Sequence, residues 1–255
     1  MVIAFRDLLA AVLDALRFLT RLPVPTPQPG AEGGGAPHPW TMAMFPVVGL
    51  FLGAILWSAS AVFERLLPHG VVDLLLLGLL ALLSGAIHWD GLIDTADALG
   101  VPAARRAEVL RDVHAGSFGV VALAFVLGIQ WAALASLSGW LHGAALLLFP
   151  LWGRWLMVAV SWNMADLRQG GGLAGAFLSH LDRRQLAWAS GGSAVLSVLL
   201  LGLIGGVLLC ALLALAAWGL RIGYRRLFGG LSGDPIGAAC VLGEAAALVV
   251  LAGLG

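Results

Sequence analysis

The sequence contains no lysine, because all fourteen of its basic residues are arginine. Enzymes that form a Schiff base through a lysine, and nucleotide-binding proteins with a P-loop lysine, are therefore excluded. Charge of either sign is also scarce: 11% of the residues are charged, against about 25% in a typical soluble domain. The formal net charge is zero, so the chain lacks the basic surface that nucleic-acid binding requires.

Cysteine and tyrosine are rare as well, with two residues of the first type and one of the second. Cys210 and Cys240 both lie in apolar runs, which favours buried packing over metal binding. Most of the chain is apolar: 60% of the residues are hydrophobic, and the mean hydropathy is +0.98. The ten tryptophans are typical of anchors at a membrane–water interface. The composition therefore predicts an integral protein of the lipid bilayer.

Long apolar runs predict the membrane-spanning helices. One run, Trp188–Leu220, would reach about 50 Å as a single helix, whereas the hydrocarbon core is about 30 Å thick. We therefore interpret it as a hairpin of two spans that turns at Gly205–Gly206. The other predicted spans are Thr41–Phe63, Val71–Trp89, Phe118–Leu137, Gly143–Trp162 and Pro235–Leu251. Gly49 and Gly53 in the first span have the spacing of a close helix contact.

The fold that these runs predict is an all-α polytopic membrane helix bundle of about seven transmembrane helices, in a single domain over residues 1–255. Between Met1 and Arg21, apolar residues recur every three to four positions, which predicts an N-terminal amphipathic helix at the interface or against the bundle. With the N-terminus in the cytoplasm, the loop arginines gather on the cytoplasmic side and only Arg65 falls outside, as the positive-inside rule requires.

Three aspartates recur directly after the second apolar run. Asp90, Asp94 and Asp97 have the spacing i, i+4, i+7, which places them within about 60° of one another on a helix. Like charges at this spacing repel, and either a divalent cation with oxygen ligands or the arginines downstream would offset the repulsion. A solvated loop is the alternative interpretation. Because Asp90 directly follows an apolar run, we favour a site in which the three aspartates hold Mg²⁺ that grips a pyrophosphate.

Two further acidic residues belong to the last span. Asp234 is expected to cap this helix, and Pro235 suits its first turn. Glu244 lies about 15 Å farther along the helix, where an ionisable side chain is costly unless it is functional or paired. Arg154, inside another span, is the expected partner. A buried pair that serves only the fold is the alternative.

The strings HWDGLIDTADAL and RDVHAGSFG resemble the signature of the cobalamin synthase family, the adenosylcobinamide-GDP ribazoletransferases. FLTRLPVP, FPVVGLFLG and GDPIGAACVLGE match that family in the same order, so the resemblance extends from Arg17 to Glu244. It implies an enzyme of late cobalamin biosynthesis that joins adenosylcobinamide-GDP with α-ribazole, or its 5′-phosphate, and releases GMP. It also implies a bacterial inner-membrane protein with a cytoplasmic active site, and a homo-oligomer is compatible with it.

The resemblance also implies roles for single residues. His88 belongs to the first family motif, and Asp234 and Glu244 occupy positions of the last, so we expect all three at the substrate. His114 has weaker support, since a lone histidine at a helix end is more often structural. Neither HxxxH nor CxxC occurs, so the sequence does not predict a zinc site.

The string RDVHAGSFG supplies the remaining candidates. Arg111 would stabilise phosphate charge through its planar guanidinium. Asp112 is either a further metal ligand or the base that takes the proton of the ribazole hydroxyl. Backbone N–H groups around Gly116, Ser117 and Gly119, at the start of the third span, would contact a phosphate oxygen.

Two other classes of membrane protein stay open. CDP-alcohol phosphotransferases carry DGxxAR and aspartate-rich prenyltransferases carry DDxxD, but here Leu92-Ile93-Asp94 follows the Asp-Gly pair and no two aspartates are adjacent. A transporter would place acidic residues near the midplane on several spans, whereas these acids cluster at one end of the predicted bundle. The transferase interpretation is therefore preferred.

Overall fold

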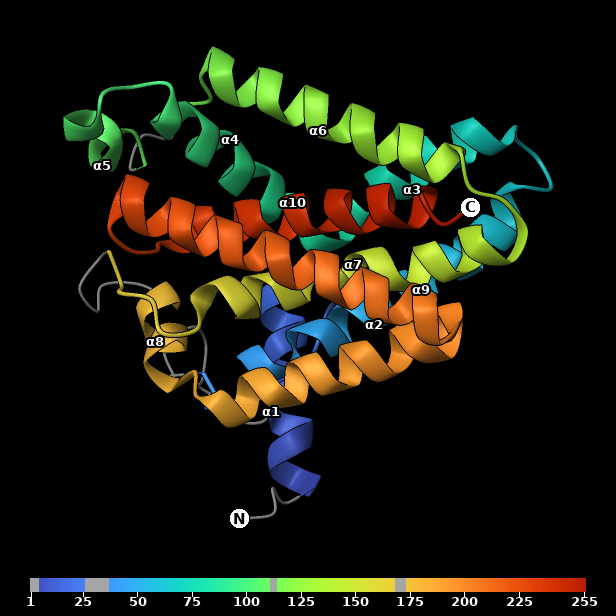
Figure 1. Ribbon diagram of the computed structural model, residues 1–255, viewed down its shortest axis with the longest axis horizontal. Coiled ribbons are helices and arrows are strands. Elements are labelled where there is room, and N and C mark those ends of the chain that lie inside the picture. The colour runs from blue at the N-terminus through green and yellow to red at the C-terminus, as the bar shows by residue number, and fades with distance from the viewer. Residues whose placement is uncertain (1–4, 26–36, 111–113, 168–172) are drawn as a thin grey trace.

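The computed structural model describes residues 5–25, 37–110, 114–167 and 173–255, and the chain folds into a bundle of long helices (Figure 1). The longer helices are α1 (Phe5–Leu19), α2 (Phe45–Phe63), α3 (His69–Ser84), α4 (Ile87–Leu99), α6 (Ser117–Ala135), α7 (Gly139–Ser161), α9 (Arg183–Phe228) and α10 (Gly233–Ala252). The shorter ones are η1 (Met42–Met44), η2 (Ala103–Arg105), α5 (Arg106–Val109) and α8 (Leu173–His180). Within the described ranges, β-pairing is limited to an isolated bridge between Asp166 and Leu231.

The apolar runs form helices because a helix satisfies its backbone hydrogen bonds internally, as a bilayer demands. In the described part of the chain, five helices are long and apolar enough to cross a membrane, or six if the bent pair α3 and α4 counts as one span. The helix α9 counts once here although it reverses direction. The all-α polytopic bundle is confirmed, and the number of seven spans stays a prediction.

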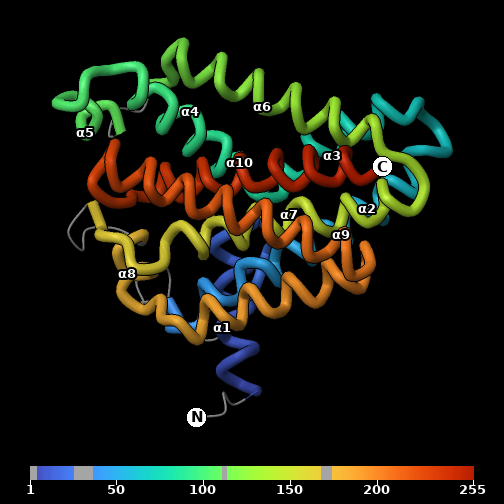
Figure 2. The backbone as a smooth tube through the Cα atoms, in the orientation of Figure 1, coloured from blue at the N-terminus to red at the C-terminus, as the bar shows by residue number. Residues whose placement is uncertain are grey.

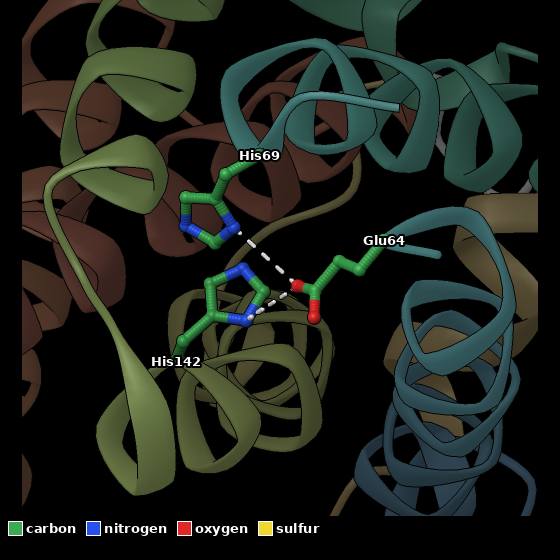
Figure 3. A group of neighbouring side chains, drawn as sticks. All are labelled: Glu64, His69 and His142. Carbon is green, nitrogen blue, oxygen red and sulfur yellow. Dashed lines mark ion pairs between the residues drawn. The ribbon is translucent and has the colours of Figure 1, made fainter. Parts of the chain in front are cut away.

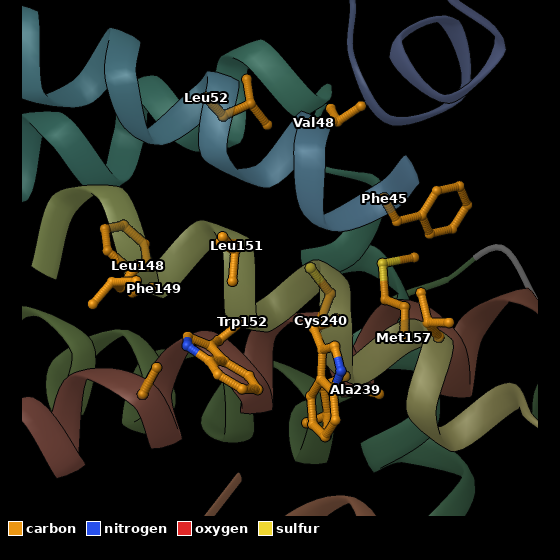
Figure 4. Packing of buried hydrophobic residues seen from close by; sticks show 14 of the residues in the cluster. Phe45, Val48, Leu52, Leu148, Phe149, Leu151, Trp152, Met157, Ala239 and Cys240 are labelled. Atoms are coloured by element: carbon orange, nitrogen blue, oxygen red, sulfur yellow. The ribbon is translucent and has the colours of Figure 1, made fainter. Parts of the chain in front are cut away.

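The helix α7 forms the centre of the bundle, and almost all of it is buried. It packs against α2 on one side and α10 on the other. Figure 4 shows buried side chains of α2, including Phe45 and Leu52, beside buried side chains of α7 such as Leu151 and Trp152. The helices α6 and α9 bury few of their apolar residues, as helices that face lipid do.

The close helix contact predicted at Gly49 and Gly53 is confirmed between α2 and α7. A Cβ atom added at Gly49 would lie 2.6 Å from the Cα of Leu151, and one added at Gly53 would lie 2.6 Å from the carbonyl oxygen of Leu146. Only glycine leaves room for the backbones to approach this closely. The pair therefore sets the distance between the two helices.

The predicted hairpin is also confirmed, with its turn at Gly202 rather than at Gly205–Gly206. Gly202 has φ 73° and ψ 174°, a conformation that interrupts the helix and that side-chain-bearing residues rarely adopt. The tube in Figure 2 runs outward to this turn and back. Gly206 instead lies where the arms meet, since a Cβ there would be 2.6 Å from the Cα of Val198.

The predicted span Val71–Trp89 does not form one continuous helix, because the chain bends by 93° between α3 and α4. Gly85 (φ 67°) and Ala86 (φ 57°) both adopt the left-handed conformation, and the Ala86 N–H donates to the Ala81 carbonyl over 2.8 Å. A left-handed residue at this position ends a helix. Asp90 consequently lies in the first turn of a separate helix rather than at the end of a span.

The predicted N-terminal amphipathic helix is confirmed as α1. Ala11, Ala15 and Leu19 are buried against the bundle, whereas Phe5 and Leu9 are exposed. Figure 1 shows α1 extending away from the other helices toward its N-terminal end. The helix therefore combines the two expected arrangements: its second half packs on the bundle, and its first half presents apolar side chains to the surroundings.

The α2–α7 contact can be tested by enlarging one glycine. We expect Gly49→Ala to lower the stability by about 1–3 kcal/mol, because its methyl group would overlap the α7 backbone. Thermal unfolding of detergent-solubilised protein measures the effect. The matched control is Gly78→Ala in α3, where an added Cβ meets no atom within 4 Å of the described structure. Unfolding of Gly49→Ala at the wild-type temperature would contradict this packing.

Candidate functional site

A cavity of about 350 Å³ lies where α4 meets the start of α10. Its polar lining comes from His88 and Asp90 of α4 and Asp234 of α10. The rest of its lining consists of Phe18, Met42, Phe45, Ile87, Met157, Ala174, Phe177, Gly233, Ile236 and Gly237. The cavity thus brings together residues of the strings HWDGLIDTADAL and GDPIGAACVLGE, which are far apart in the sequence.

The two polar motifs meet through a backbone contact at Gly91. A Cβ atom added to Gly91 would lie 2.7 Å from the carbonyl oxygen of Asp234 and 3.2 Å from the Cα of Gly237. The glycine that follows Asp90 is therefore required for α4 to reach the first turn of α10. This contact fixes the position of Asp90 relative to Asp234.

The expectation that Asp234 caps α10 is wrong. Ser232 occupies the N-cap position, and Asp234 lies in the first turn of the helix. The Ser232 hydroxyl donates to the Asp234 carboxylate over 3.4 Å. A carboxylate in the first turn interacts favourably with the positive end of the helix dipole. Asp234 is therefore held on the cavity wall by the start of α10.

His88 lies in the wall of the same cavity and is only 4% exposed. Its Nε2 atom is buried and makes no hydrogen bond to any described residue. A buried polar atom without a partner is costly, and a ligand in the cavity would relieve this cost. His88 therefore lines the same cavity as Asp90, and its contact with a substrate stays a prediction.

Three phenylalanine rings form the apolar side of the cavity. The ring centroid of Phe18 lies 4.6 Å from that of Phe177 and 5.8 Å from that of Phe45. Phe45 and Phe177 meet edge to face at 5.8 Å. Sequence analysis assigned no role to these side chains. Phe18 and Phe45 lie in strings that carry the family resemblance, FLTRLPVP and FPVVGLFLG, which was the available signal.

A second cavity, of about 290 Å³, includes Asp97, His114, Gly116 and Ser117 in its lining. The Asp97 carboxylate accepts hydrogen bonds from the Gly116 N–H over 2.7 Å and from the Gly119 N–H over 2.8 Å. The start of α6 thus binds a carboxylate of the chain itself. This differs from the expected contact of these amides with a phosphate oxygen, which stays a prediction, as does a role for Ser117.

The three aspartates lie on one helix, α4, as predicted. Seven residues separate Asp90 from Asp97, which corresponds to about 10.5 Å along the helix, so a single ion cannot bind both. The two side chains also line different cavities. Asp94 lies between them. Arg111 and Asp112 lie outside the described residues, and their predicted roles are not addressed by the structure.

The predicted pairing of Glu244 with Arg154 is confirmed. The Arg154 guanidinium donates to the Glu244 carboxylate, and the two residues are 0% and 3% exposed. Arg154 also donates to the Pro150 carbonyl over 3.4 Å, and the Cys240 thiol lies 3.8 Å from the carboxylate. Neither charged residue lines the two cavities described above. The pair joins α7 to α10, and substrate contact by Glu244 stays a prediction.

The amino-acid sequence was compared with protein-family models, with characterised proteins and with solved structures. A family model described as cobalamin-5-phosphate synthase matches residues 11–252. A protein of Ectopseudomonas mendocina named adenosylcobinamide-GDP ribazoletransferase is 41% identical over 243 residues, covering 93% of this chain and 96% of that protein. A Pseudomonas aeruginosa protein of the same name is 38% identical over 256 residues, covering 97% and 99%. No solved structure matches the chain.

The buried pair makes a prediction about stability. Replacing Glu244 with alanine leaves the Arg154 charge buried without its partner, so we expect a loss of about 3–5 kcal/mol. The double variant Arg154→Met/Glu244→Leu should recover most of this loss, because two apolar side chains pack without charge. Thermal unfolding in detergent measures both variants.

The matched control is the exposed pair of Arg105 and Glu108, at 3.4 Å. Glu108→Ala should change stability by less than about 1 kcal/mol. If Glu244→Ala were equally mild, the buried pair would not hold α7 to α10.

Proposed function

Because the chain belongs to the cobalamin-5-phosphate synthase family, we propose that it is an adenosylcobinamide-GDP ribazoletransferase, an enzyme of late cobalamin biosynthesis. The observation that carries the proposal is the match to relatives of that name over nearly the whole of both chains. In this reaction the ribazole hydroxyl attacks the phosphorus joined to cobinamide. The bond from that phosphorus to the oxygen of GMP breaks, GMP leaves, and the hydroxyl gives up its proton.

The polar wall of the α4–α10 cavity is proposed to bind the pyrophosphate of adenosylcobinamide-GDP. Phosphoryl transfer depends on positioning and on neutralising charge, more than on covalent chemistry by the protein. Asp90 and Asp234 bring negative charge to this wall, so an anionic pyrophosphate can bind only with a cation. Carboxylate oxygens are the ligands that Mg²⁺ prefers. The donor set therefore fits Mg²⁺, which remains a proposal.

Within the predicted metal set, Asp90 and Asp94 are the best-placed residues, because four positions on a helix bring two side chains onto one face, one turn apart. Asp234 lines the same cavity as Asp90 and would supply a further carboxylate. Asp97 takes part only if a second ion binds farther along α4. When bound, Mg²⁺ would neutralise charge on the pyrophosphate and on the leaving GMP.

His88 is proposed to accept the proton of the attacking hydroxyl. Its buried Nε2 has no hydrogen-bond partner among the described residues, and it lines the cavity beside Asp90. A neutral imidazole is suited to general base catalysis near neutral pH. Asp112 keeps its alternative role as base or further metal ligand, as proposed from the family motif.

The three phenylalanine rings are proposed to bind the acceptor substrate. Ribazole is a nucleoside with an aromatic base, and aromatic side chains stack on such bases. Phe18, Phe45 and Phe177 line the cavity together with Asp90 and Asp234. An acceptor base held against these rings would leave its ribose hydroxyl on the polar side of the same cavity. One cavity thereby accommodates both reacting groups.

The active site is proposed to face the cytoplasm from a bacterial inner membrane. Figure 1 places α5 and both ends of α9 at the same end of the bundle as the N-terminal half of α10. The described arginines of that end are Arg105, Arg106, Arg183, Arg184, Arg221, Arg225 and Arg226. Arginine-rich loops favour the cytoplasmic side. Arg65 follows α2 at the other end.

Removal of one carboxylate tests the polar wall. We expect Asp90→Asn to lower the rate of GMP release by about 100-fold or more, the effect of losing one charge-stabilising group in an active site. The assay uses adenosylcobinamide-GDP, α-ribazole and Mg²⁺, with EDTA as the metal-free comparison. Asp7→Asn, an exposed change in α1, serves as the control. Full Mg²⁺-dependent turnover by Asp90→Asn would rule out this role.

A ring deletion tests the acceptor side. Phe177→Ala should raise the KM for α-ribazole about tenfold, because stacking on one base is worth about 1–3 kcal/mol. The KM for adenosylcobinamide-GDP should change little. Phe118→Ala is the control, since this ring lines the other cavity. A larger effect of Phe118→Ala than of Phe177→Ala on the KM for α-ribazole would place the acceptor beside Asp97 instead.

A further inference from the structure

A cluster of metal-ligand side chains lies at the end of the bundle away from the α4–α10 cavity. Glu64 follows α2, His69 begins α3, and His142 lies in the first turn of α7. Figure 3 shows the two imidazole rings and the carboxylate pointing toward one another. Within the described ranges, this is the group of His, Cys, Asp and Glu in which three ligand atoms lie within 4.8 Å of one another.

The hydrogen bonds of the two histidines determine which ring nitrogens can bind a ligand. The His142 Nε2 lies 2.8 Å from the Asp73 carboxylate, and the His69 Nε2 lies 3.0 Å from the Leu137 carbonyl. A carboxylate and a carbonyl only accept hydrogen bonds, so both Nε2 atoms must carry hydrogen. In the neutral rings, both Nδ1 atoms therefore present lone pairs.

Both of these Nδ1 atoms face the same oxygen of Glu64. The His69 Nδ1 lies 3.4 Å from Glu64 Oε1, and the His142 Nδ1 lies 3.8 Å from it. Three lone-pair-bearing atoms that converge in this way repel one another unless a cation lies between them. In a tetrahedral site with metal–ligand distances of about 2.0–2.1 Å, neighbouring ligand atoms are about 3.3–3.4 Å apart. The separation from the His69 Nδ1 agrees with this value, and the separation from the His142 Nδ1 is longer by about 0.4 Å.

The surroundings of the cluster also favour a divalent cation. Asp73 is fully buried, and its Oδ2 atom makes no hydrogen bond to a described residue, although it lies 3.5 Å from the His69 Nε2. Glu64 is the C-cap of α2, where the helix dipole disfavours a negative charge. The cluster combines two histidines with two carboxylates, so one divalent ion bound to it would balance the charge of both carboxylates.

Outer contacts hold the ligands as they do in metal sites. A histidine ligand usually donates its second ring N–H to a carboxylate or a backbone carbonyl. Asp73 fills this role for His142, and the Leu137 carbonyl fills it for His69. The Ser60 hydroxyl donates to Glu64 Oε1 over 2.9 Å and fixes the carboxylate.

We propose that Glu64, His69 and His142 bind one Zn²⁺ ion, which fastens the ends of α2, α3 and α7 to one another. Two imidazole nitrogens and one carboxylate oxygen form a ligand set typical of zinc, whereas Mg²⁺ prefers oxygen ligands alone. Glu64 is exposed, so water can occupy the fourth position. The site is separate from the α4–α10 cavity and concerns the fold rather than the transfer reaction.

The test is Zn²⁺ binding by purified full-length protein that carries an affinity tag without histidines. After treatment with a chelator, the protein is titrated with Zn²⁺ in competition with a chromophoric chelator, and Co²⁺ is used in parallel because its visible spectrum reports the coordination number. We expect one equivalent to bind. His69→Ala and His142→Ala should each weaken binding at least 100-fold, and Glu64→Gln at least tenfold. His180→Ala, an exposed change in α8, should bind like the wild type.

Folding and binding are separated by a second measurement. Glu64→Gln retains the shape of an exposed side chain, so its size-exclusion profile should match that of the wild type. Zn²⁺ should raise the unfolding temperature of the wild type but not that of Glu64→Gln, because a ligand stabilises only the state that binds it. If the wild type bound no stoichiometric Zn²⁺, the proposal would be overturned. Equal binding by His69→Ala and His142→Ala would also overturn it, since the metal would then lie elsewhere.

Discussion

A backbone contact too close for any side chain joins α4 to the first turn of α10. A Cβ atom at Gly91 would lie 2.7 Å from the Asp234 carbonyl oxygen, so the two motif helices approach more closely than any residue with a side chain would allow here. Asp90 precedes this glycine and lines the cavity with Asp234. The polar wall of the cavity depends on this contact, since a shift of either helix would separate the carboxylates of Asp90 and Asp234.

Three restraints keep α4 and α10 in place. The left-handed turn at Gly85–Ala86 directs α4 away from α3 by 93°. The Asp97 carboxylate accepts two backbone N–H groups at the start of α6 and so fixes the far end of α4. The buried pair of Arg154 and Glu244 joins α10 to α7, the most buried helix of the bundle. Asp97 and Glu244 thus make contacts that hold the helices, whereas Asp90 and Asp234 line the cavity.

Features that depend on apolar runs or on large energetic costs could be predicted from the sequence. A single helix over Trp188–Leu220 would exceed the bilayer thickness, which required a hairpin. An ionised Glu244 inside a span required a partner, and Arg154 was available. The bend at Gly85–Ala86 was not predicted, because a Gly-Ala pair within an apolar sequence is also compatible with a continuous helix.

Features that depend on long-range contacts were also missed. The hydrogen bonds of Asp97 to Gly116 and Gly119 join residues on different helices, and the spacing of the aspartates carries no trace of them. The cluster of His69 and His142 was missed for the same reason, since motif spacing detects only ligands that are close in the sequence. The aromatic wall was visible only as part of family strings. Local periodicity therefore predicts helices, whereas cavities require the packing between them.

The position of the bound nucleotide substrate tests the account most directly. A cryo-electron microscopy structure of the protein with adenosylcobinamide-GDP should show the pyrophosphate in the α4–α10 cavity, between Asp90 and Asp234, with His88 in contact. A pyrophosphate in the other cavity, beside Asp97, His114 and the start of α6, would contradict it. In that case the contact at Gly91 would serve only the fold.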